Sequence, residues 1–143
     1  FLGLIDENNQ IGLNDYEGSF LVLYFYPKDK TSGCTLQSQD FREYKNKFAD
    51  KNCKIIGISR DSIKSHKSFT EKESLNFPLI SDPDETICNA YGVMKEKSMY
   101  GRKYMGIERS TFVIDPDGNL IKEWRGVKVP GHVEEVYKFI CEL

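Results

Sequence analysis

The chain carries four cysteines, Cys34, Cys53, Cys88 and Cys141, and a thiol is the side chain best suited to nucleophilic or redox chemistry. The four are widely spaced and form no C-x-x-C pair. This spacing argues against a zinc site, a thioredoxin-type dithiol and a dense disulfide framework. Each cysteine therefore has to be judged by its own surroundings.

Cys34 lies in "TSGCT", directly after a glycine and at the start of a segment with helical periodicity. Apolar and small residues recur every three or four positions from Cys34 to Ala49, which predicts a helix. The sulfur then lies in the first helical turn, beside unpaired backbone N–H groups that favour a thiolate over a thiol. One interpretation is a reactive nucleophile, and the other is a cysteine that merely caps a helix.

The other three cysteines have weaker support as reactive groups. Cys53 opens an apolar segment, and Cys141 shares the apolar stripe of the last predicted helix with Tyr137, so both are expected to be buried and inert. Cys88 lies next to Ile87 on a short predicted helix. An inert thiol is favoured there over a redox-active one, because no neighbour in the sequence would stabilise a thiolate.

Strands and helices alternate around Cys34. Residues 20–26, "FLVLYFY", form an apolar run typical of a strand covered on both faces, and Pro27 ends it. The turn at 116–118, "PDG", predicts a hairpin between its flanking β-type segments. The pattern predicts strands at 20–26, 53–59 and 77–81, helices at 34–49, 63–74 and 84–91, a hairpin of 110–115 with 120–124, a last helix at 132–143, and an unassigned polar stretch at 94–108.

This order of elements predicts an α/β protein with a thioredoxin-like layered fold. With 143 residues, the chain has the length of one ordinary domain, and we expect a single domain over residues 1–143. There are no internal repeats.

The segment "YPKDKTSGCT" resembles the peroxiredoxins, whose signature is Pro, three residues, Thr, two residues and the reacting Cys. Here these are Pro27, Thr31 and Cys34. Two more blocks, "KEKSMYGRKYMGIERSTFVIDPDGNL" (95–120) and "EWRGVKVPGH" (123–132), resemble the peroxiredoxin Q subgroup, also called bacterioferritin comigratory protein. The resemblance implies a thioredoxin-like fold with a central mixed sheet flanked by helices and an N-terminal β-hairpin.

The resemblance also implies a peroxide site made by Pro27, Thr31, Cys34 and Arg109. The Cys34 thiolate would attack a hydroperoxide and become a sulfenic acid. Arg109 and backbone N–H groups would stabilise the moving negative charge. Thr31 would accept a hydrogen bond from the peroxide, and Pro27 would shield the sulfur from water. Taken alone, Arg109 would more simply form a surface ion pair with Glu108.

The sequence departs from the usual family pattern T-P-G-C-T-x-E-A at three places, Ser32, Gln37 and Ser38. Activity is expected to survive Ser32, whereas Gln37 replaces a charged residue that would help to position the loop. The two usual places for a second, resolving cysteine hold Gln39 and Thr70.

Two routes then remain for the Cys34 sulfenic acid. An external thiol reduces it, which makes a one-cysteine enzyme, or Cys88 forms a disulfide with it. The disulfide would require local unfolding, because the two Cα atoms must come within about 7 Å. We favour the external thiol, with thioredoxin or glutaredoxin and glutathione as reductant and hydrogen peroxide and organic hydroperoxides as substrates. The alternative function is a non-enzymatic peroxide sensor or redox-regulated chaperone that uses the same cysteine.

Composition and charge narrow the partners. The formal net charge of −2 and the pI near 5.8 argue against nucleic acid. No apolar run reaches the roughly 20 residues of a membrane span, so we expect a cytoplasmic protein with no membrane partner. The chain begins with Phe1, and any targeting segment would precede it. We expect a monomer with no cofactor and no metal.

Four other residues need an interpretation. His66, in the polar "KSHKS" segment, is expected to be solvated. His132 opens the last predicted helix, and a hydrolase-type pair with Cys34 is conceivable but lacks a third group. Trp124 is expected at a sheet edge, and Arg125 is expected as a surface charge that could lie near the site.

Overall fold

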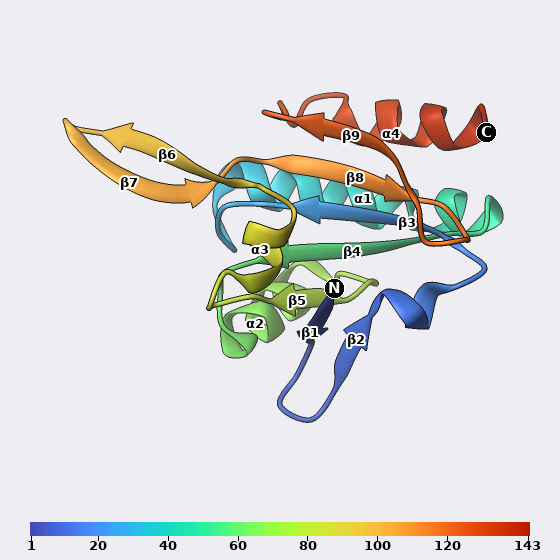
Figure 1. Ribbon diagram of the computed structural model, residues 1–143, viewed down its shortest axis with the longest axis horizontal. Helices are drawn as coiled ribbons and strands as arrows, with labels where there is room; N and C mark the ends of the chain where they lie inside the picture. Colours follow the sequence, from blue (N-terminus) through green and yellow to red (C-terminus); the bar gives the residue numbers. More distant parts are fainter.

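A mixed seven-stranded sheet forms the centre of the protein, in the order β2-β1-β5-β4-β3-β8-β9 (Figure 1). The structure is a computed structural model that describes residues 1–143. β3, β4 and β5 are parallel, whereas β8 runs antiparallel to β3. The strands of this sheet are β1 (Leu2–Leu4), β2 (Gln10–Gly12), β3 (Phe20–Phe25), β4 (Cys53–Ser59), β5 (Leu79–Ser81), β8 (Ser110–Ile114) and β9 (Leu120–Arg125).

Helices cover both faces of this sheet, because successive residues of its central strands are apolar and point to opposite faces. Val22 and Tyr24 of β3 pack in one cluster with side chains of α1 (Ser32–Asp50), α2 (Ile63–Glu73) and α4 (His132–Cys141). Leu21 and Leu23 pack in the other, with side chains of α3 (Thr86–Ala90). In Figure 1, α1 lies behind the sheet and α3 in front of it.

The predicted fold class is confirmed. β1 and β2 form the expected N-terminal antiparallel hairpin, after which a 3-10 turn, η1 (Leu13–Tyr16), leads into β3. The predicted strand at 53–59 has the observed bounds, and α1 begins two residues before the predicted start. None of the helices combines the length and the apolar character that crossing a membrane requires.

The structure adds one pair of strands that the sequence did not indicate and corrects the expectation for Cys141. Residues 94–108 hold an antiparallel pair, β6 (Met94–Met99) and β7 (Arg102–Ile107), that forms a sheet of its own and projects from the molecule (Figure 1). It was missed because most of its side chains are exposed, so no apolar alternation marks its strands. Cys141 is exposed rather than buried. The buried stripe of α4 runs through Val136 and Ile140, and Cys141 falls beside that stripe.

Candidate active site

Cys34 is the third residue of α1 and is 1% exposed. The backbone at Thr31 is extended (φ −80°, ψ 155°) and forms the N-cap of the helix, whose first bond runs from the Thr35 N–H to the Thr31 carbonyl oxygen (2.8 Å). The N–H groups that precede Thr35 in the first turn have no partner within the helix. Cys34 therefore lies among unpaired backbone donors at the positive end of a 19-residue helix.

Arg109 reaches this sulfur from the segment between β7 and β8. Its Nη2 atom lies 3.4 Å from Cys34 Sγ, and its Nη1 donates to Gln37 Oε1 at 2.6 Å. The simpler alternative of a surface pair between Arg109 and Glu108 is absent, because Glu108 pairs with Lys95 (2.8 Å). One planar guanidinium thus bridges two side chains that lie three residues apart on the same face of α1.

Gln37 is fully buried and contributes to this arrangement in two ways. Its carbonyl oxygen accepts the hydrogen bond from Arg109, which fixes the guanidinium without adding a negative charge. Its amide nitrogen is buried and has no hydrogen-bond partner in the protein. A buried donor without a partner is costly, and both N–H groups of this amide are left without an acceptor in the protein.

Pro27 and Thr31 flank the loop that leads into α1. Pro27 follows the buried Tyr26 at the end of β3 and is itself half-buried. Thr31 is exposed, and its hydroxyl donates to the Lys28 carbonyl oxygen at 2.8 Å. Because that bond uses the hydroxyl proton, Thr31 Oγ1 is left as a hydrogen-bond acceptor three residues before Cys34.

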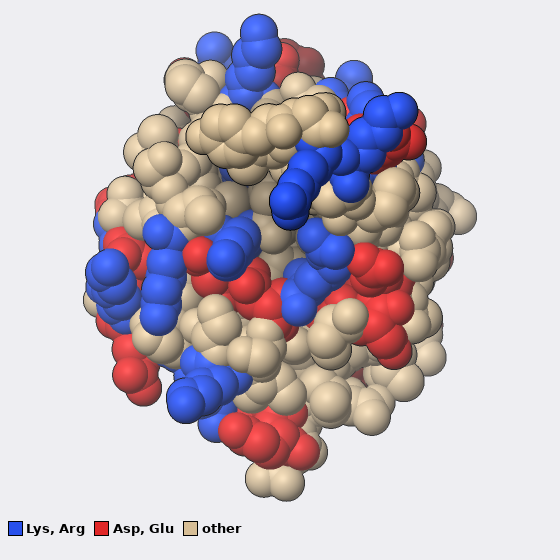
Figure 2. Space-filling view, turned by 90° about the vertical axis from the view of Figure 1, so that its left-hand side faces the viewer, with Lys and Arg blue, Asp and Glu red and all other residues tan.

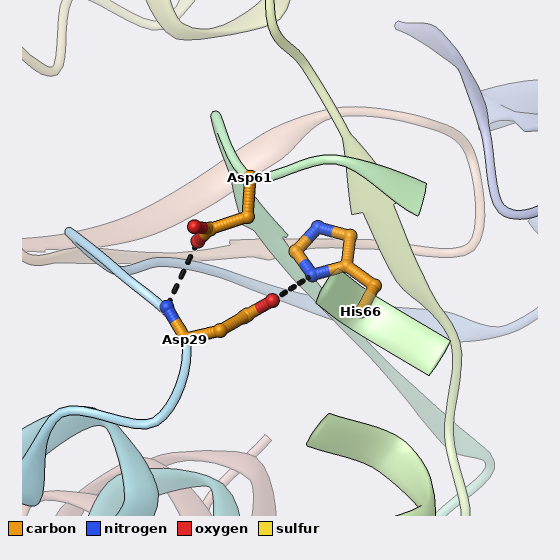
Figure 3. A group of neighbouring side chains, drawn as sticks. All are labelled: Asp29, Asp61 and His66. Carbon is orange, nitrogen blue, oxygen red and sulfur yellow. Dashed lines mark hydrogen bonds and ion pairs between the residues drawn. The ribbon is translucent and has the colours of Figure 1, made fainter. Parts of the chain in front are cut away.

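His66 is not solvated, as its polar sequence context had suggested, but 3% exposed, and it anchors this loop (Figure 3). Its Nδ1 lies 2.7 Å from Asp29 Oδ2, and its Nε2 lies 3.0 Å from the carbonyl oxygen of Ile80 in β5. Both ring nitrogens face acceptors and are placed to donate. The sequence expectation failed because a histidine among Lys and Ser residues gives no sign of a buried acceptor.

Asp29 is the centre of the cluster shown in Figure 3 and was missed by sequence reasoning. Besides His66, its carboxylate accepts from the hydroxyls of Tyr26 (2.6 Å) and Ser65 (2.7 Å), and its backbone N–H donates to Asp61 (2.8 Å). Burial alone would raise the pKa of Asp29, but the hydrogen bonds, with that from His66 the largest, outweigh it and lower this pKa.

The same cluster has the composition of a metal site, since Asp29, Asp61 and His66 offer ligand atoms within 4.8 Å of one another. The atoms are already committed, however. Asp29 and His66 face each other at hydrogen-bond distance, and Asp61 Oδ2 accepts from Ser59 (2.6 Å) as well as from Asp29. The arrangement is therefore that of a structural anchor joining the loop before α1 to α2 and β5.

Cys53 and Cys88 lie in environments that oppose a thiolate. Burial raises the pKa of Cys53 to about 12. Burial, followed by the hydrogen bond and charge of Asp82, raises the pKa of Cys88. Cys88 also packs in the core cluster on the face of the sheet opposite to Cys34. Both thiols are buried, as was expected for Cys53.

His132 does not pair with Cys34. Its Nε2 lies 2.8 Å from Thr111 Oγ1, and its ring packs edge-on against Trp124. Burial, with a smaller contribution from the charge of Arg109, lowers the pKa of His132 to about 4, so the ring is neutral at physiological pH. The conceivable hydrolase pair is therefore absent.

Arg125 is exposed and donates to the carbonyl oxygens of Gly92 (2.9 Å) and Tyr91 (3.0 Å).

Comparison with known proteins adds the relatives of this chain. Residues 3–123 match the AhpC/TSA family. Peroxiredoxin Bcp of Xanthomonas campestris is 50% identical over 127 residues, covering 89% of this chain and 79% of the relative. Peroxiredoxin Bcp of Bacillus subtilis is 47% identical over 138 residues, covering 96% of this chain and 88% of the relative.

Solved structures agree with these relatives. A structure of the Xanthomonas campestris bacterioferritin comigratory protein, from a study of its alkyl peroxide reduction, superposes with a TM-score of 0.96 at 44% identity, covering 99% of this chain and 89% of that one. Mycobacterium tuberculosis BcpB superposes with a TM-score of 0.87 at 26% identity, covering 100% and 92%. The chain belongs to the AhpC/TSA family, among the peroxiredoxins of the Bcp type.

Proposed function

We propose that the protein is a thiol-dependent peroxidase in which Cys34 reduces hydrogen peroxide and organic hydroperoxides. The single observation that carries this assignment is the guanidinium of Arg109, placed 3.4 Å from Cys34 Sγ and held from behind by Gln37. Membership of the peroxiredoxins supports the same reaction class, because peroxiredoxins are thiol-dependent peroxidases.

The reaction at Cys34 is a displacement at oxygen. The thiolate attacks the distal peroxide oxygen, an S–O bond forms as the O–O bond breaks, and the leaving oxygen takes up a proton to become water or an alcohol. Negative charge moves from sulfur to that oxygen. Arg109 and the first N–H groups of α1 stabilise it along this path, and Thr31 Oγ1 accepts a hydrogen bond from the bound hydroperoxide. Pro27 limits access of water to the sulfur.

The resulting sulfenic acid is recycled by an external thiol in this proposal. Gln39 and Thr70 occupy the places of the usual resolving cysteines. Cys88 is on the other face of the sheet, and Cys53 pairs with Phe20 at the opposite end of β3 from the site. The positions of Cys88 and Cys53 support the one-cysteine route, because neither would form a disulfide with Cys34 without local unfolding.

We further assign to the protein a single domain over residues 1–143 that acts as a cytoplasmic monomer, with thioredoxin or glutaredoxin and glutathione as candidate reductants. The decisive assay compares both reducing systems side by side and follows peroxide consumption. Cys34→Ser is expected to abolish turnover, whereas Cys53→Ser should leave it nearly intact.

Two outcomes would contradict the proposal. Consumption of about one equivalent of peroxide, without further turnover by any thiol, would indicate the sensor or chaperone instead. After one equivalent of peroxide, intact mass measurement should find one added oxygen on Cys34. A disulfide between Cys34 and Cys88 would contradict the one-cysteine route.

A further inference from the structure

The β6–β7 hairpin carries exposed apolar side chains at its end. Met99 is 56%, Tyr100 96% and Tyr104 43% exposed. With Arg102 and Lys103 they line a shallow depression, which we call the tip surface. In Figure 2, which faces the hairpin end-on, an uncharged ridge is flanked by Lys and Arg side chains. Clusters of this kind on a small protein commonly mark interaction sites.

The turn of the hairpin favours the same conclusion. Tyr100 and Gly101 both have positive φ values, 52° and 78°, as in a type I′ turn. The first position of such a turn normally holds Asn, Asp or Gly, and an aromatic residue there is strained. Tyr100 thus has an unfavourable backbone conformation and an almost fully exposed ring. Neither feature stabilises the hairpin. A residue that violates local preference in this way points to a function.

Three residues of the tip surface, Met99, Arg102 and Tyr104, lie on the face of the hairpin that leads to the active site, whereas Lys103 lies on the other face. Directly paired residues of antiparallel strands share a face, and the register places Met99 with Arg102 and Lys97 with Tyr104. Lys95, nearer the base of this face, donates to Glu108, the residue before Arg109, at 2.8 Å. Lys97 is half-buried on the same face, and burial and then the charge of Arg109 lower its pKa. Met105 pairs with Glu96 on the opposite face and is also exposed, at 53%.

The hairpin tip and the active site are close enough for one protein partner to contact both. Arg109 follows the last residue of β7 by two positions, and six residues of strand span about 20 Å. A standard interface buries about 800 Å² per partner, a patch about 30 Å across. A protein that brings its own thiol to Cys34 would therefore cover the tip surface as well.

We propose that the tip surface is the docking site for the dithiol protein that reduces the Cys34 sulfenic acid. This inference rests on the proposed function. Tyr, Met and Arg are the residue types enriched in protein interfaces and their hot spots. Residues 94–107 hold four basic and one acidic side chain in a chain of net charge −2, so the partner has an acidic rim around its reactive thiol.

The partner supplies the two thiols that reduce the sulfenic acid of Cys34 in the docked complex. Its first thiolate attacks the Cys34 sulfenic sulfur, a mixed disulfide forms, and the hydroxyl leaves as water after taking up a proton. Its second thiol then attacks the partner's own sulfur, which releases Cys34 as a thiol and the partner as a disulfide. Because Cys34 is 1% exposed, the first turn of α1 opens in this step.

The test compares two reductants on the same variants. Tyr100→Asn removes the ring while providing a residue that suits the turn, so it is expected to maintain or raise the melting temperature. Its kcat/KM for a bacterial thioredoxin, measured with thioredoxin reductase and NADPH, should fall about ten-fold, as for a hot-spot side chain. Its rate with dithiothreitol, which needs no docking surface, should equal that of the unmodified protein.

Two matched controls keep this result specific. Met105→Ala changes an exposed side chain on the opposite face of the same hairpin, and Leu120→Ala changes one that is 51% exposed on β9. Both should leave kcat/KM for thioredoxin unchanged. Raising the salt concentration should lower kcat/KM for thioredoxin but not the rate with dithiothreitol.

Several results would overturn the inference. Equal thioredoxin kinetics for Tyr100→Asn and the unmodified protein would remove the docking role while leaving the peroxidase intact. If the unmodified protein consumes no peroxide with either thioredoxin or dithiothreitol, the proposed function itself is contradicted. Two further results, each with unchanged thioredoxin kinetics in Tyr100→Asn, would assign the tip surface to another partner. If the unmodified protein sediments with phosphatidylglycerol vesicles and Tyr100→Asn does not, the partner is a membrane. If the unmodified protein is a dimer in analytical ultracentrifugation and Tyr100→Asn is not, the partner is a second copy of the chain.

Discussion

His66 Nδ1 lies 2.7 Å from Asp29 Oδ2, which joins α2 to the loop that leads into Cys34. His66 is fixed on its other side by the Ile80 carbonyl oxygen of β5 (3.0 Å). The loop is thus held from the central sheet through one imidazole ring. Asp29 has no hydrogen bond to Cys34 or Arg109, so we expect Asp29 and His66 to act as positioning residues whose effect reaches the reaction through Thr31 and the start of α1.

Two substitutions of His66 separate its two hydrogen bonds. The amide nitrogen of Asn takes the place of Nδ1, and that of Gln takes the place of Nε2. His66→Asn therefore retains a donor for Asp29, and His66→Gln retains one for Ile80. We expect His66→Gln to lower the rate of sulfenic acid formation about ten-fold, the effect of about 1.4 kcal/mol, and His66→Asn to retain most of it.

Rapid-mixing measurements of peroxide consumption, with urea unfolding of both variants, check this expectation. Similar losses of stability with unequal rates would support positioning through Asp29. Equal rates in the two variants would show that the ring only fills the core.

The sequence predicted the elements that carry strong local signals. The apolar runs of β3 and β4 and the periodicity of α1 fixed the frame around Cys34, and the resemblance to peroxiredoxins selected Arg109 from a distant segment. The Asp29–His66 anchor could not be predicted, because its partners lie 37 positions apart and neither has an apolar neighbour pattern that signals burial. The β6–β7 hairpin could not be predicted because most of its side chains are exposed, so its strands show no alternation of apolar and polar residues.

Arg109 is expected to contribute most of the charge stabilisation at the site. Arg109→Lys retains a positive charge but cannot donate to Gln37 and reach Cys34 Sγ at once, because an ammonium is a point charge and not a planar fork. We predict a fall in the second-order rate constant for peroxide of about 100-fold for Arg109→Lys and more for Arg109→Ala. Stopped-flow kinetics at several peroxide concentrations measure it. A loss of less than about two-fold in Arg109→Lys would show that charge alone suffices.

Substitutions of Gln37 test whether its hydrogen bond to Arg109 contributes to the reaction rate. Gln37→Met has a similar volume but offers no acceptor to Nη1, so it should lower the rate constant for peroxide about ten-fold. Gln37→Glu retains an acceptor and removes the unpartnered amide nitrogen, so it should keep the rate within a few-fold of the original. The same stopped-flow assay compares the two. The reverse order, with Met more active than Glu, would show that a neutral residue is required and an acceptor is not.

His132 is expected to make the fold sensitive to mild acid. Its folded pKa of about 4 lies below the unfolded value of about 6.5, so between these values the unfolded chain binds more protons than the folded one. Stability should therefore fall as pH decreases from 6.5 towards 4, by an amount on the order of a few kcal/mol. His132→Gln, whose amide can replace the Nε2 contact with Thr111, should reduce this dependence. Urea unfolding at pH 7, 6, 5 and 4 measures both proteins, and parallel pH profiles would show that His132 is not the group responsible.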